Sequence, residues 1–369
     1  MSPTQQAQLT SLPRRTLVTG GAGFIGTHLC RGLLARGDLV TIVDDYSTGR
    51  PDNVDLLRAE FPRRGAITMI EADVRDGLLS LETARFDEIY HLAATVGVRL
   101  IMNDPIKAAE TNLECTNRVL RYAVESGRQH GRSPAILLAS SSEVYGKSSA
   151  LPFSEDDDVV YGSTRMTRWS YAQCKALNEH MGLAYHRQYA LPVVIARLFN
   201  TVGPGQVGEY GMVLPRFIRA ALDGSPLTVH GDGRQVRCFC DARDVTRALV
   251  ELTAGVACHG RVFNVGSDHA VSIAELADLV IELTDSPSIK EFVSYERVFG
   301  SGFEDPRERR PDLARVREAI GFEPRWTLKE TILDIAASML EPASPDLRSA
   351  VGAERLELGG AAPRAVWLR

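Results

Sequence analysis

The sequence has no excess of positive charge and no long run of apolar residues. Its 42 lysines and arginines are outnumbered by 47 aspartates and glutamates, so the formal net charge is −5. Proteins that bind nucleic acids or acidic membrane surfaces usually carry a basic excess, so we expect neither partner. No apolar run approaches the ~20 residues of a membrane-spanning helix. Residues 1–13 are polar and lack the apolar core of a signal peptide, which predicts a disordered leader.

Cysteine is scarce, and its positions show no grouping that would hold a metal ion. We therefore expect no metal site, and we predict a cytoplasmic protein with reduced thiols. Hydrophobic residues make up 44% of the 369 residues, which is enough for one large or two moderate domains with a sizeable core. The six cysteines are Cys30, Cys115, Cys174, Cys238, Cys240 and Cys258.

A glycine-rich turn near the N-terminus lies between a predicted strand and a predicted helix. Residues 16–26 read TLVTGGAGFIG, and an apolar, helix-like run follows from residue 24 to 34. Glycine at Gly20, Gly23 and Gly26 leaves room for a tight turn, for phosphates and for close packing of helix on strand. The N–H groups and the positive end of the helix favour a pyrophosphate. Alone, the turn is typical of an NAD- or FAD-dependent oxidoreductase.

The next predicted strand, residues 39–44, ends in an acid. Asp44 follows Gly26 at close to the ~20 residues that separate the glycines from the ribose-binding acid in dinucleotide-binding folds. Such an acid accepts hydrogen bonds from the adenosine ribose and repels the 2′-phosphate of NADP. We therefore expect NAD as the cofactor.

Apolar strands alternate with amphipathic helices through the first 200 residues. Further strands are predicted at 66–73, 86–94, 135–139 and 193–200, and a helix is predicted from about 105 to 126. This alternation predicts an α/β fold, a doubly wound parallel sheet covered by helices on both faces.

Five motifs occur in a fixed order: TGGAGFIG, HLAA, SSEVYG, Tyr171-x-x-x-Lys175 and RLFNTVGP. Together they resemble the extended short-chain dehydrogenase/reductase family, the NAD-dependent nucleotide-sugar epimerases, dehydratases and decarboxylases. The resemblance runs from Arg15 to about Leu340. It implies a Rossmann-type domain with a smaller C-terminal α/β domain for the nucleotide sugar. It also implies a UDP-sugar as substrate.

The spacing of Tyr171 and Lys175 places both side chains on one face of a helix. A lysine ammonium close to a phenol stabilises the phenolate, so we expect a lowered pKa for Tyr171. Such a tyrosine can remove a proton from a sugar hydroxyl while the carbon delivers hydride to NAD. The resemblance makes Ser141 a hydrogen-bond partner of the same hydroxyl.

The resemblance also implies domain boundaries and binding residues. We expect the NAD domain at 14–200 with interleaved segments at 236–270, the substrate domain mainly at 201–340, and a tail at 341–369. Cofactor contacts are expected from Gly20, Gly23, Phe24, Ile25, Gly26, Asp44, Asp73, Val74, Leu92, Ala93, Ala94, Asn112, Tyr171 and Lys175. Substrate contacts are expected from Arg99, Ser142, Asn200, Arg237 and Arg309.

The residues around the sugar decide the reaction. Glu143 stands where simple 4-epimerases carry a small or hydroxylated residue, and a carboxylate there suits chemistry at C5 and C6. Ser142 replaces the acid expected before it in dehydratases, which disfavours dehydration. Arg168-Trp-Ser-Tyr171 and the segment around Arg309 resemble UDP-glucuronate decarboxylases and UDP-apiose/xylose synthases. Arg309 falls on their catalytic arginine, which protonates the carbanion left after CO₂ departs. A UDP-hexuronate decarboxylase is therefore the leading hypothesis.

Two alternatives stay open. Residues 95–105, which include Arg99, resemble the Gly-Val-Arg loop of UDP-glucuronate 4-epimerases, so a 4-epimerase acting on UDP-glucuronate or UDP-glucose is the main rival. A catalytically inactive protein that binds sugar nucleotides is the second. Such proteins usually lose the catalytic Tyr or Lys, and both are present here.

The family pairs the helix after Pro105 and the helix carrying Tyr171 across a homodimer, so a homodimer is expected. Arg243 and Arg247 are predicted to be ordinary surface charges. Ser272 and Glu275 predict a capping box at the start of a helix.

Overall fold

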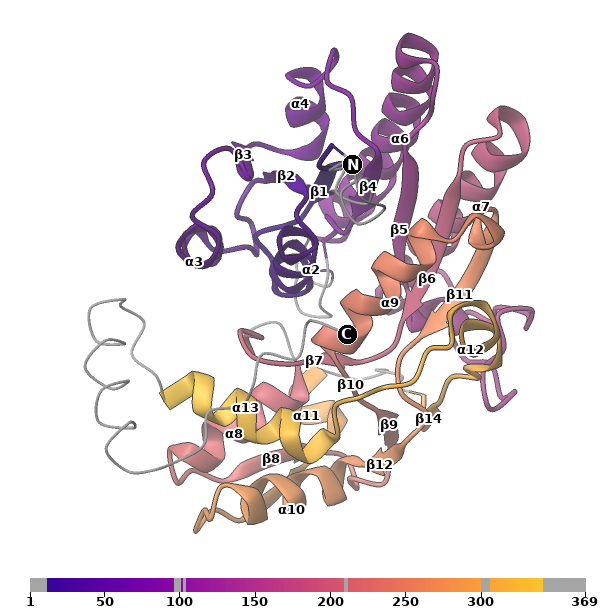
Figure 1. Ribbon diagram of the computed structural model, residues 1–369. Coiled ribbons are helices and arrows are strands. Elements are labelled where there is room, and N and C mark those ends of the chain that lie inside the picture. The colour runs from indigo at the N-terminus through magenta and orange to yellow at the C-terminus, as the bar shows by residue number, and fades with distance from the viewer. Residues whose placement is uncertain (1–11, 96–100, 102–103, 209–211, 300–305, 341–369) are drawn as a thin grey trace.

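The computed structural model describes residues 12–95, 101, 104–208, 212–299 and 306–340, and the predicted substrate contact from Arg99 lies outside these residues. A large region with a central sheet is joined to a smaller region built mainly from later parts of the chain (Figure 1). The described helices include none that is both long and apolar enough to cross a membrane. Within these same ranges, no group of acidic, histidine and cysteine side chains is arranged to hold a metal ion.

The central sheet has seven parallel strands in the described ranges, in the order β11-β6-β5-β4-β1-β2-β3. Successive side chains point to opposite faces, and both faces are largely covered, so the inner strands are mostly buried and apolar, whereas the edge strand β3 is partly exposed. The predicted doubly wound parallel sheet is confirmed, with a seventh strand, β11, that the sequence did not single out. The strands are β1 Arg15–Thr19, β2 Leu39–Asp44, β3 Ile67–Glu71, β4 Glu88–His91, β5 Ala135–Ser141, β6 Val193–Leu198 and β11 Arg261–Val265.

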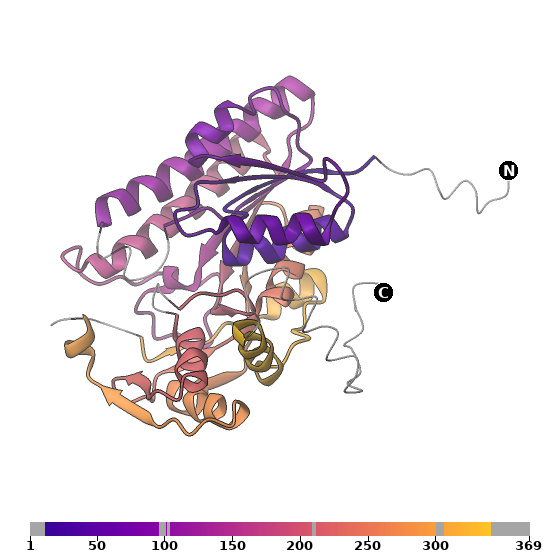
Figure 2. The ribbon, with the colours of Figure 1, turned by 90° about the vertical axis from the view of Figure 1, so that its left-hand side faces the viewer.

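Helices cover both faces of this sheet, and Figure 2 shows them on either side of it. One apolar core lies under α2, α3, α9 and α12, and the other lies under α4, α6 and α7. The predicted helix after Pro105 extends about one turn further than expected and ends at Gly131 in the left-handed conformation. The helices are α2 Phe24–Ala35, α3 Pro51–Glu60, α4 Val74–Leu79, α6 Pro105–His130, α7 Ser170–Tyr189, α9 Ala242–Ala254 and α12 Ala314–Ile320.

The smaller region has its own apolar core between α8, α10 and α13. The predicted capping box is confirmed, since Ser272 and Glu275 exchange hydrogen bonds at the start of α10. The elements of the smaller region are α8 Val213–Leu222, β8 Leu227–His230, β9 Val236–Cys238, β12 Ala270–Ser272, α10 Ile273–Leu283, β13 Lys290–Val293, α11 Tyr295–Phe299, β14 Glu308–Arg309 and α13 Leu328–Leu340.

Two arginines predicted to be surface charges instead tie segments together. Arg243 pairs with Asp241 and Asp334, both at 2.8 Å, and its guanidinium lies 3.3 Å from the centre of the Trp326 ring. Arg247 pairs with Asp244 at 3.1 Å and donates to the carbonyl of Glu323. The prediction was wrong because the partners of both arginines come mostly from a segment some 80 residues later, which no local pattern reveals.

A short parallel pair connects the two regions. Strand β7 (Thr201–Val202) follows the sixth strand of the large sheet, and β10 (Cys240–Asp241) precedes α9. The chain therefore leaves the large sheet after β6, returns for α9 and β11, and returns again for α12. This interleaving brings the smaller region over the carboxyl ends of the parallel strands, where α/β folds place their ligands.

Candidate functional site

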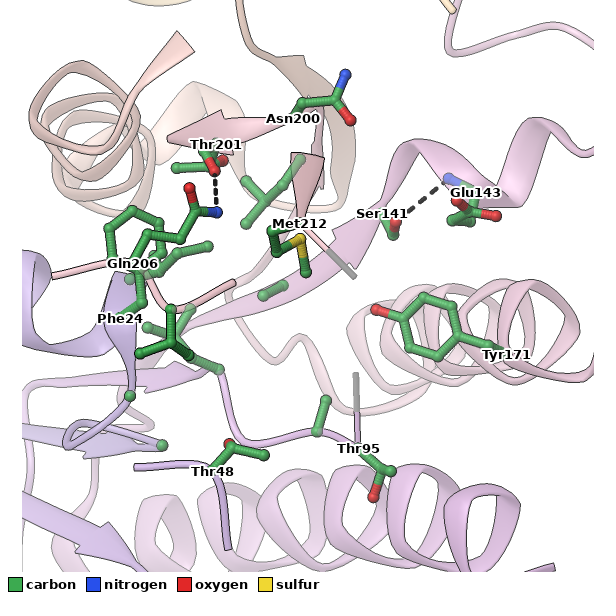
Figure 3. Close-up of a pocket in the computed structure, with 18 of the residues that line it drawn as sticks. Phe24, Thr48, Thr95, Ser141, Glu143, Tyr171, Asn200, Thr201, Gln206 and Met212 are labelled. Carbon is green, nitrogen blue, oxygen red and sulfur yellow. Dashed lines mark hydrogen bonds between the residues drawn. The ribbon is translucent and has the colours of Figure 1, made fainter. Parts of the chain in front are cut away.

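A cleft of about 550 Å³ lies between the carboxyl ends of the large sheet and the smaller region (Figure 3). Both regions line it. The loops after β1, β2 and β4 form one end, and residues of η1 (Ser142–Tyr145), α7, α8, β9 and β14 form the other. We name the end formed by the loops after β1, β2 and β4 the cofactor end, and the other end the sugar end.

The glycine turn has the geometry that the sequence predicts. Gly20 has φ +74°, and a Cβ there would lie 2.7 Å from the backbone nitrogen of Ala93. A Cβ at Gly26 would overlap the carbonyl oxygen of Gly20. No side chain caps the N-terminus of α2, and no acidic residue lies in its first turn. The first N–H groups of α2 therefore fit the pyrophosphate of a dinucleotide.

Asp44 lies beside this turn and is buried. Its Oδ2 accepts a hydrogen bond from the N–H of Ala22, and its Oδ1 accepts one from the N–H of Tyr46, both at 2.9 Å. Burial raises the pKa of Asp44, although these two N–H groups oppose the shift. A carboxylate oxygen has a second lone pair, so Asp44 still suits ribose hydroxyls. The sequence reading missed other side chains that line this end, namely Asp45, Ser47, Thr48, Arg50 and Asn53.

The other predicted cofactor residues, with one exception, line the cleft. Val74, Leu92, Ala93 and Ala94 do so, and Asp73 caps α4 while pairing with Arg75 at 2.8 Å. The exception is Asn112. Its Oδ1 accepts a hydrogen bond from the N–H of Thr95 at 3.0 Å, and it does not line the cleft. Asn112 therefore holds the loop after β4 through Thr95, and its predicted cofactor contact stays a prediction.

Tyr171 and Lys175 share one face of α7, as their spacing predicts. The phenol of Tyr171 points into the cleft (Figure 3), and Lys175 Nζ lies 5.9 Å from the centre of its ring. Lys175 Nζ donates to the carbonyl of Ala139 at 2.8 Å, and burial lowers its pKa to about 8. Ser141 lies at the end of β5, within reach of the same part of the cleft.

The expected lowering of the Tyr171 pKa is wrong for the protein by itself. Burial raises the pKa of Tyr171, and the neighbouring Glu143 carboxylate raises it further, while Ser141 opposes the shift. Lys175, whose Nζ donates to the carbonyl of Ala139, does not outweigh the effect of burial on the pKa of Tyr171. The protein alone therefore favours the protonated phenol of Tyr171. A positive charge bound near the phenol would lower its pKa and favour the phenolate.

Glu143 stands at the centre of the sugar end. Its Oε1 pairs with Arg309, and its Oε2 lies 3.5 Å from Nη2 of Arg168. Burial alone would raise the pKa of Glu143, but Arg309 and Arg168 outweigh it, so the pKa is lowered. Glu143 is thus an ionised, largely buried carboxylate between two guanidinium groups.

Arg309 reaches this position through the pairing of β14 with β9. The two strands run parallel, with Arg309 opposite Arg237, and both arginines are buried and line the cleft. Asn200 also lines it, and its Nδ2 donates to the carbonyl of Cys238 at 3.0 Å. Ser142 lines the cleft as well. Arg216, Gln206 and Tyr295, which the sequence did not single out, also line this end. So do Thr228, His230 and Gln235, which lie in the segment 227–239 that resembles the nucleotide-binding part of the substrate domain.

A buried polar network lies behind the segments that carry Ser141, Glu143 and Tyr171. Glu179 of α7 accepts hydrogen bonds from Ser140 at 2.5 Å and from Arg197 Nη2 at 2.7 Å. Arg197 also lies over the ring of Tyr145, whose hydroxyl donates to Asn264 at 2.6 Å. This network ties β5, β6, η1 and α7 together, so it fixes the distances between Ser141, Glu143 and Tyr171.

Comparisons with known proteins agree with this architecture. Residues 16–266 match the model of the NAD dependent epimerase/dehydratase family. The chain is 40% identical over 326 residues to a UDP-N-acetyl-alpha-D-glucosaminuronate decarboxylase of Bacillus cytotoxicus, covering 87% of this chain and 97% of that protein. It is 36% identical over 318 residues to UDP-glucuronic acid decarboxylase 2 of Arabidopsis thaliana, covering 86% of this chain and 66% of that protein.

A solved structure gives the same result. The UDP-glucuronic acid 4-epimerase of Bacillus cereus, in complex with UDP-glucuronic acid and NAD, superposes with a TM-score of 0.76 at 26% identity. The superposition covers 88% of this chain and 98% of that chain. The family match spans well over half of the chain, and the fold, the glycine turn and the cleft agree with it. The chain therefore belongs to the NAD dependent epimerase/dehydratase family.

Proposed function

We propose that this protein is an NAD-dependent UDP-hexuronate decarboxylase that acts through a 4-keto sugar. The observation that carries the proposal is the position of Glu143. An ionised carboxylate held by Arg309 and Arg168 lies beside Ser141 and Tyr171, where the carbons next to C4 of a sugar would lie. The names of the two decarboxylases reported above support the same reaction class.

The charge of the sugar end suits an anionic sugar nucleotide. Among the described residues that line it, Glu143 is the one acid, facing Arg168, Arg216, Arg237, Arg309 and Lys175. A UDP-hexuronate brings a diphosphate and a carboxylate into this end. A planar guanidinium group matches the oxygens of both. We assign the diphosphate to Arg237 and the sugar to Ser142, Asn200 and Arg309.

The first chemical step is oxidation at C4. Tyr171 takes the proton of the C4 hydroxyl, Ser141 holds that hydroxyl by a hydrogen bond, and Lys175 keeps the surroundings of Tyr171 positive. NAD, when bound, supplies a hydride acceptor and a positive charge near the phenol. C4 loses a hydride and its hydroxyl loses a proton, so a ketone forms.

The second step is loss of CO₂. The C5–C6 bond breaks, and its electron pair moves onto C5 and the C4 ketone as an enolate. Arg309 provides a proton at C5, and Glu143 orients Arg309 for that transfer. Return of the hydride to C4 would give a UDP-pentose, whereas release before that return would give the 4-keto pentose.

The cofactor site is assigned to the glycine turn, Asp44 and the segments at Asp73 and Leu92. Asn112 is assigned a positioning role.

The domain boundaries, a cytoplasmic location and a homodimer formed through α6 and α7 belong to the same proposal. The exposed apolar side chains of Ile106 and Leu177 on these helices suit such a contact, which light scattering coupled to size exclusion would test.

A direct assay tests the reaction. The enzyme is incubated with NAD and either UDP-glucuronate or UDP-N-acetylglucosaminuronate, and CO₂ release and product mass are followed. We expect a product lighter by CO₂ from at least one of them. A product of unchanged mass would make the protein a 4-epimerase and contradict the proposal. No conversion of any sugar nucleotide, with Tyr171→Phe without effect, would favour the inactive binding protein.

A further inference from the structure

Asn264 is an asparagine of β11 with none of its surface exposed, so it lies behind the cleft rather than in its wall. Its side-chain amide has two N–H donors, and both are used. Nδ2 donates to the carbonyl of Phe153 at 2.8 Å and to the carbonyl of Asp312 at 3.1 Å. Its Oδ1 accepts a hydrogen bond from the hydroxyl of Tyr145 at 2.6 Å. One buried amide therefore joins three segments that lie far apart in the chain.

The first of these segments carries Glu143. Tyr145 is the last residue of η1, the short helix that also contains Glu143. The ring of Tyr145 stacks on the ring of Phe153, with 4.5 Å between the ring centres and 10° between their planes. Burial raises the pKa of Tyr145 to about 12, so its hydroxyl keeps the proton that it donates to Asn264 at neutral pH. The position of η1 therefore depends on Asn264.

The second segment carries Arg309. Strand β14 ends at Arg309 and pairs with β9 of the smaller region. Directly after it, the N–H of Phe153 donates to the carbonyl of Arg310, and the N–H of Asp312 donates to the carbonyl of Phe153, both at 2.8 Å. The carbonyls of Phe153 and Asp312 are the two acceptors of Asn264. Asn264 thus ties this segment to the large sheet, while β9 ties it to the smaller region.

The groups assigned to the oxidation at C4 are held by other contacts. Ser141 ends β5, which pairs with β6 along its whole length. Lys175 donates to the carbonyl of Ala139 at 2.8 Å, and Tyr171 belongs to the same helix. In the part of the chain that the structure describes, the hydrogen bonds of Asn264 reach none of these residues.

We propose that Asn264 is a positioning residue for the second chemical step, because it sets the separation between Glu143 and Arg309. The inference rests on the proposed function. Without the amide, the Tyr145 hydroxyl and the Asp312 carbonyl lose a buried partner, and their segments can shift relative to each other. Proton delivery from Arg309 to C5 then suffers, because a displacement of about 1 Å can slow a step about 10²-fold.

Single-turnover kinetics of the NAD-loaded enzyme tests this role, with UDP-glucuronate or UDP-N-acetylglucosaminuronate as the substrate. The absorbance of reduced nicotinamide reports the oxidation at C4, and CO₂ release reports the second step. Asn264→Ala should leave the oxidation rate nearly unchanged and slow CO₂ release about 10- to 100-fold. Reduced nicotinamide and the 4-keto hexuronate should therefore accumulate.

Two further variants show whether the effect passes through Arg309. Tyr145→Phe removes one hydrogen bond of Asn264 and keeps the stacked ring, so it should change the ratio of the two rates in the same direction by a smaller factor. In an Arg309→Ala background, Asn264→Ala should slow CO₂ release no further, because residues that act through one another are not additive.

A matched control removes a buried hydrogen bond between other segments. The hydroxyl of Thr331 on α13 is buried and donates to Asp241 at 2.9 Å. Thr331→Val keeps the shape of the side chain, so it should lower Tm and leave the ratio of the two rates as in the wild type. Melting curves of all variants show which of them are folded.

The outcomes separate this role from a structural one and from the proposed function. Equal slowing of both steps in Asn264→Ala would overturn the role of Asn264, and so would further slowing in the Arg309→Ala background. If Asn264→Ala does not fold, Tyr145→Phe decides, and an unchanged ratio of rates would overturn the role. A wild-type enzyme that converts the sugar nucleotide without releasing CO₂ would contradict the proposed function itself, and the role of Asn264 would fall with it.

Discussion

The cofactor end and the sugar end of the cleft differ in how their residues are brought together. The cofactor end is built largely from one stretch, in which Gly20, Gly26 and Asp44 lie within two adjacent strands and the intervening helix. The sugar end joins segments far apart in the chain, since Glu143 meets Arg309 across 166 residues. Backbone geometry determines the shape of the cofactor end, whereas long-range pairing of side chains assembles the sugar end. Substitutions at the cofactor end should therefore lower stability and NAD binding, and substitutions at the sugar end should mainly lower turnover.

The largest expected effect belongs to the sugar end. Tyr171→Phe removes the general base while keeping the ring, so we expect turnover of UDP-glucuronate to fall about 10²- to 10⁴-fold with little change in Tm. Initial rates and melting curves measure both. Tyr185→Phe is the matched control, because the Tyr185 hydroxyl makes only a partly exposed hydrogen bond to Asn117 at 3.3 Å. If the control lost as much activity, the role given to Tyr171 would be refuted.

Glu143→Gln and Arg309→Ala should stall the reaction between its two steps. Oxidation at C4 depends on Tyr171, Ser141 and Lys175, so it should continue, while loss of CO₂ should slow about 10²-fold or more. Reduced nicotinamide and the 4-keto sugar should then accumulate. Stopped-flow absorbance and product mass measure this. Normal turnover in both variants would show that the sugar end is assigned wrongly.

Gly26→Ala should affect the cofactor end through the backbone. A Cβ at this position overlaps the Gly20 carbonyl, so we expect about 1–3 kcal/mol loss of stability together with weaker NAD binding. Gly32→Ala is the matched control in the same helix. A Cβ at Gly32 meets nothing within 4 Å, so it should stabilise α2 by up to about 1 kcal/mol and leave NAD binding unchanged. Urea unfolding and NAD titration distinguish the two. Equal stability of the two variants would argue against the tight turn.

The smallest effect is a pH dependence of stability. The folded state holds the pKa of Glu143 below its usual range, so ionised Glu143 stabilises the fold at neutral pH. This contribution is lost as the pH falls through the folded-state pKa. The Tm of the wild type should exceed that of Glu143→Gln by a few degrees at neutral pH, and the difference should close in acid below the usual glutamate range. A gap that widened on acidification would contradict the assigned ion pair.

Local sequence was sufficient for the geometry of the glycine turn and for the fold class. Only glycine fits Gly20 and Gly26, and apolar runs joined by helices leave few folds other than a parallel sheet. Local sequence failed where a side chain depends on a distant partner. Arg243 and Arg247 looked like surface charges until Trp326 and Glu323 were placed beside them. The hydrogen bonds of Asn112 to Thr95, 17 residues away in the chain, likewise became visible only in the fold.

The same distinction holds for the chemistry. The sequence by itself determined the glycine turn and the placing of Tyr171 and Lys175 on one helical face, because each rests on residues close together in the chain. It also determined the family, because the order of the five motifs can be read without any contact between them. Tertiary structure alone placed Arg309 and Arg168 on opposite oxygens of Glu143, and it alone showed that burial raises the pKa of Tyr171. Burial and charge act through space, and their balance at a site is decided by segments that no local pattern connects.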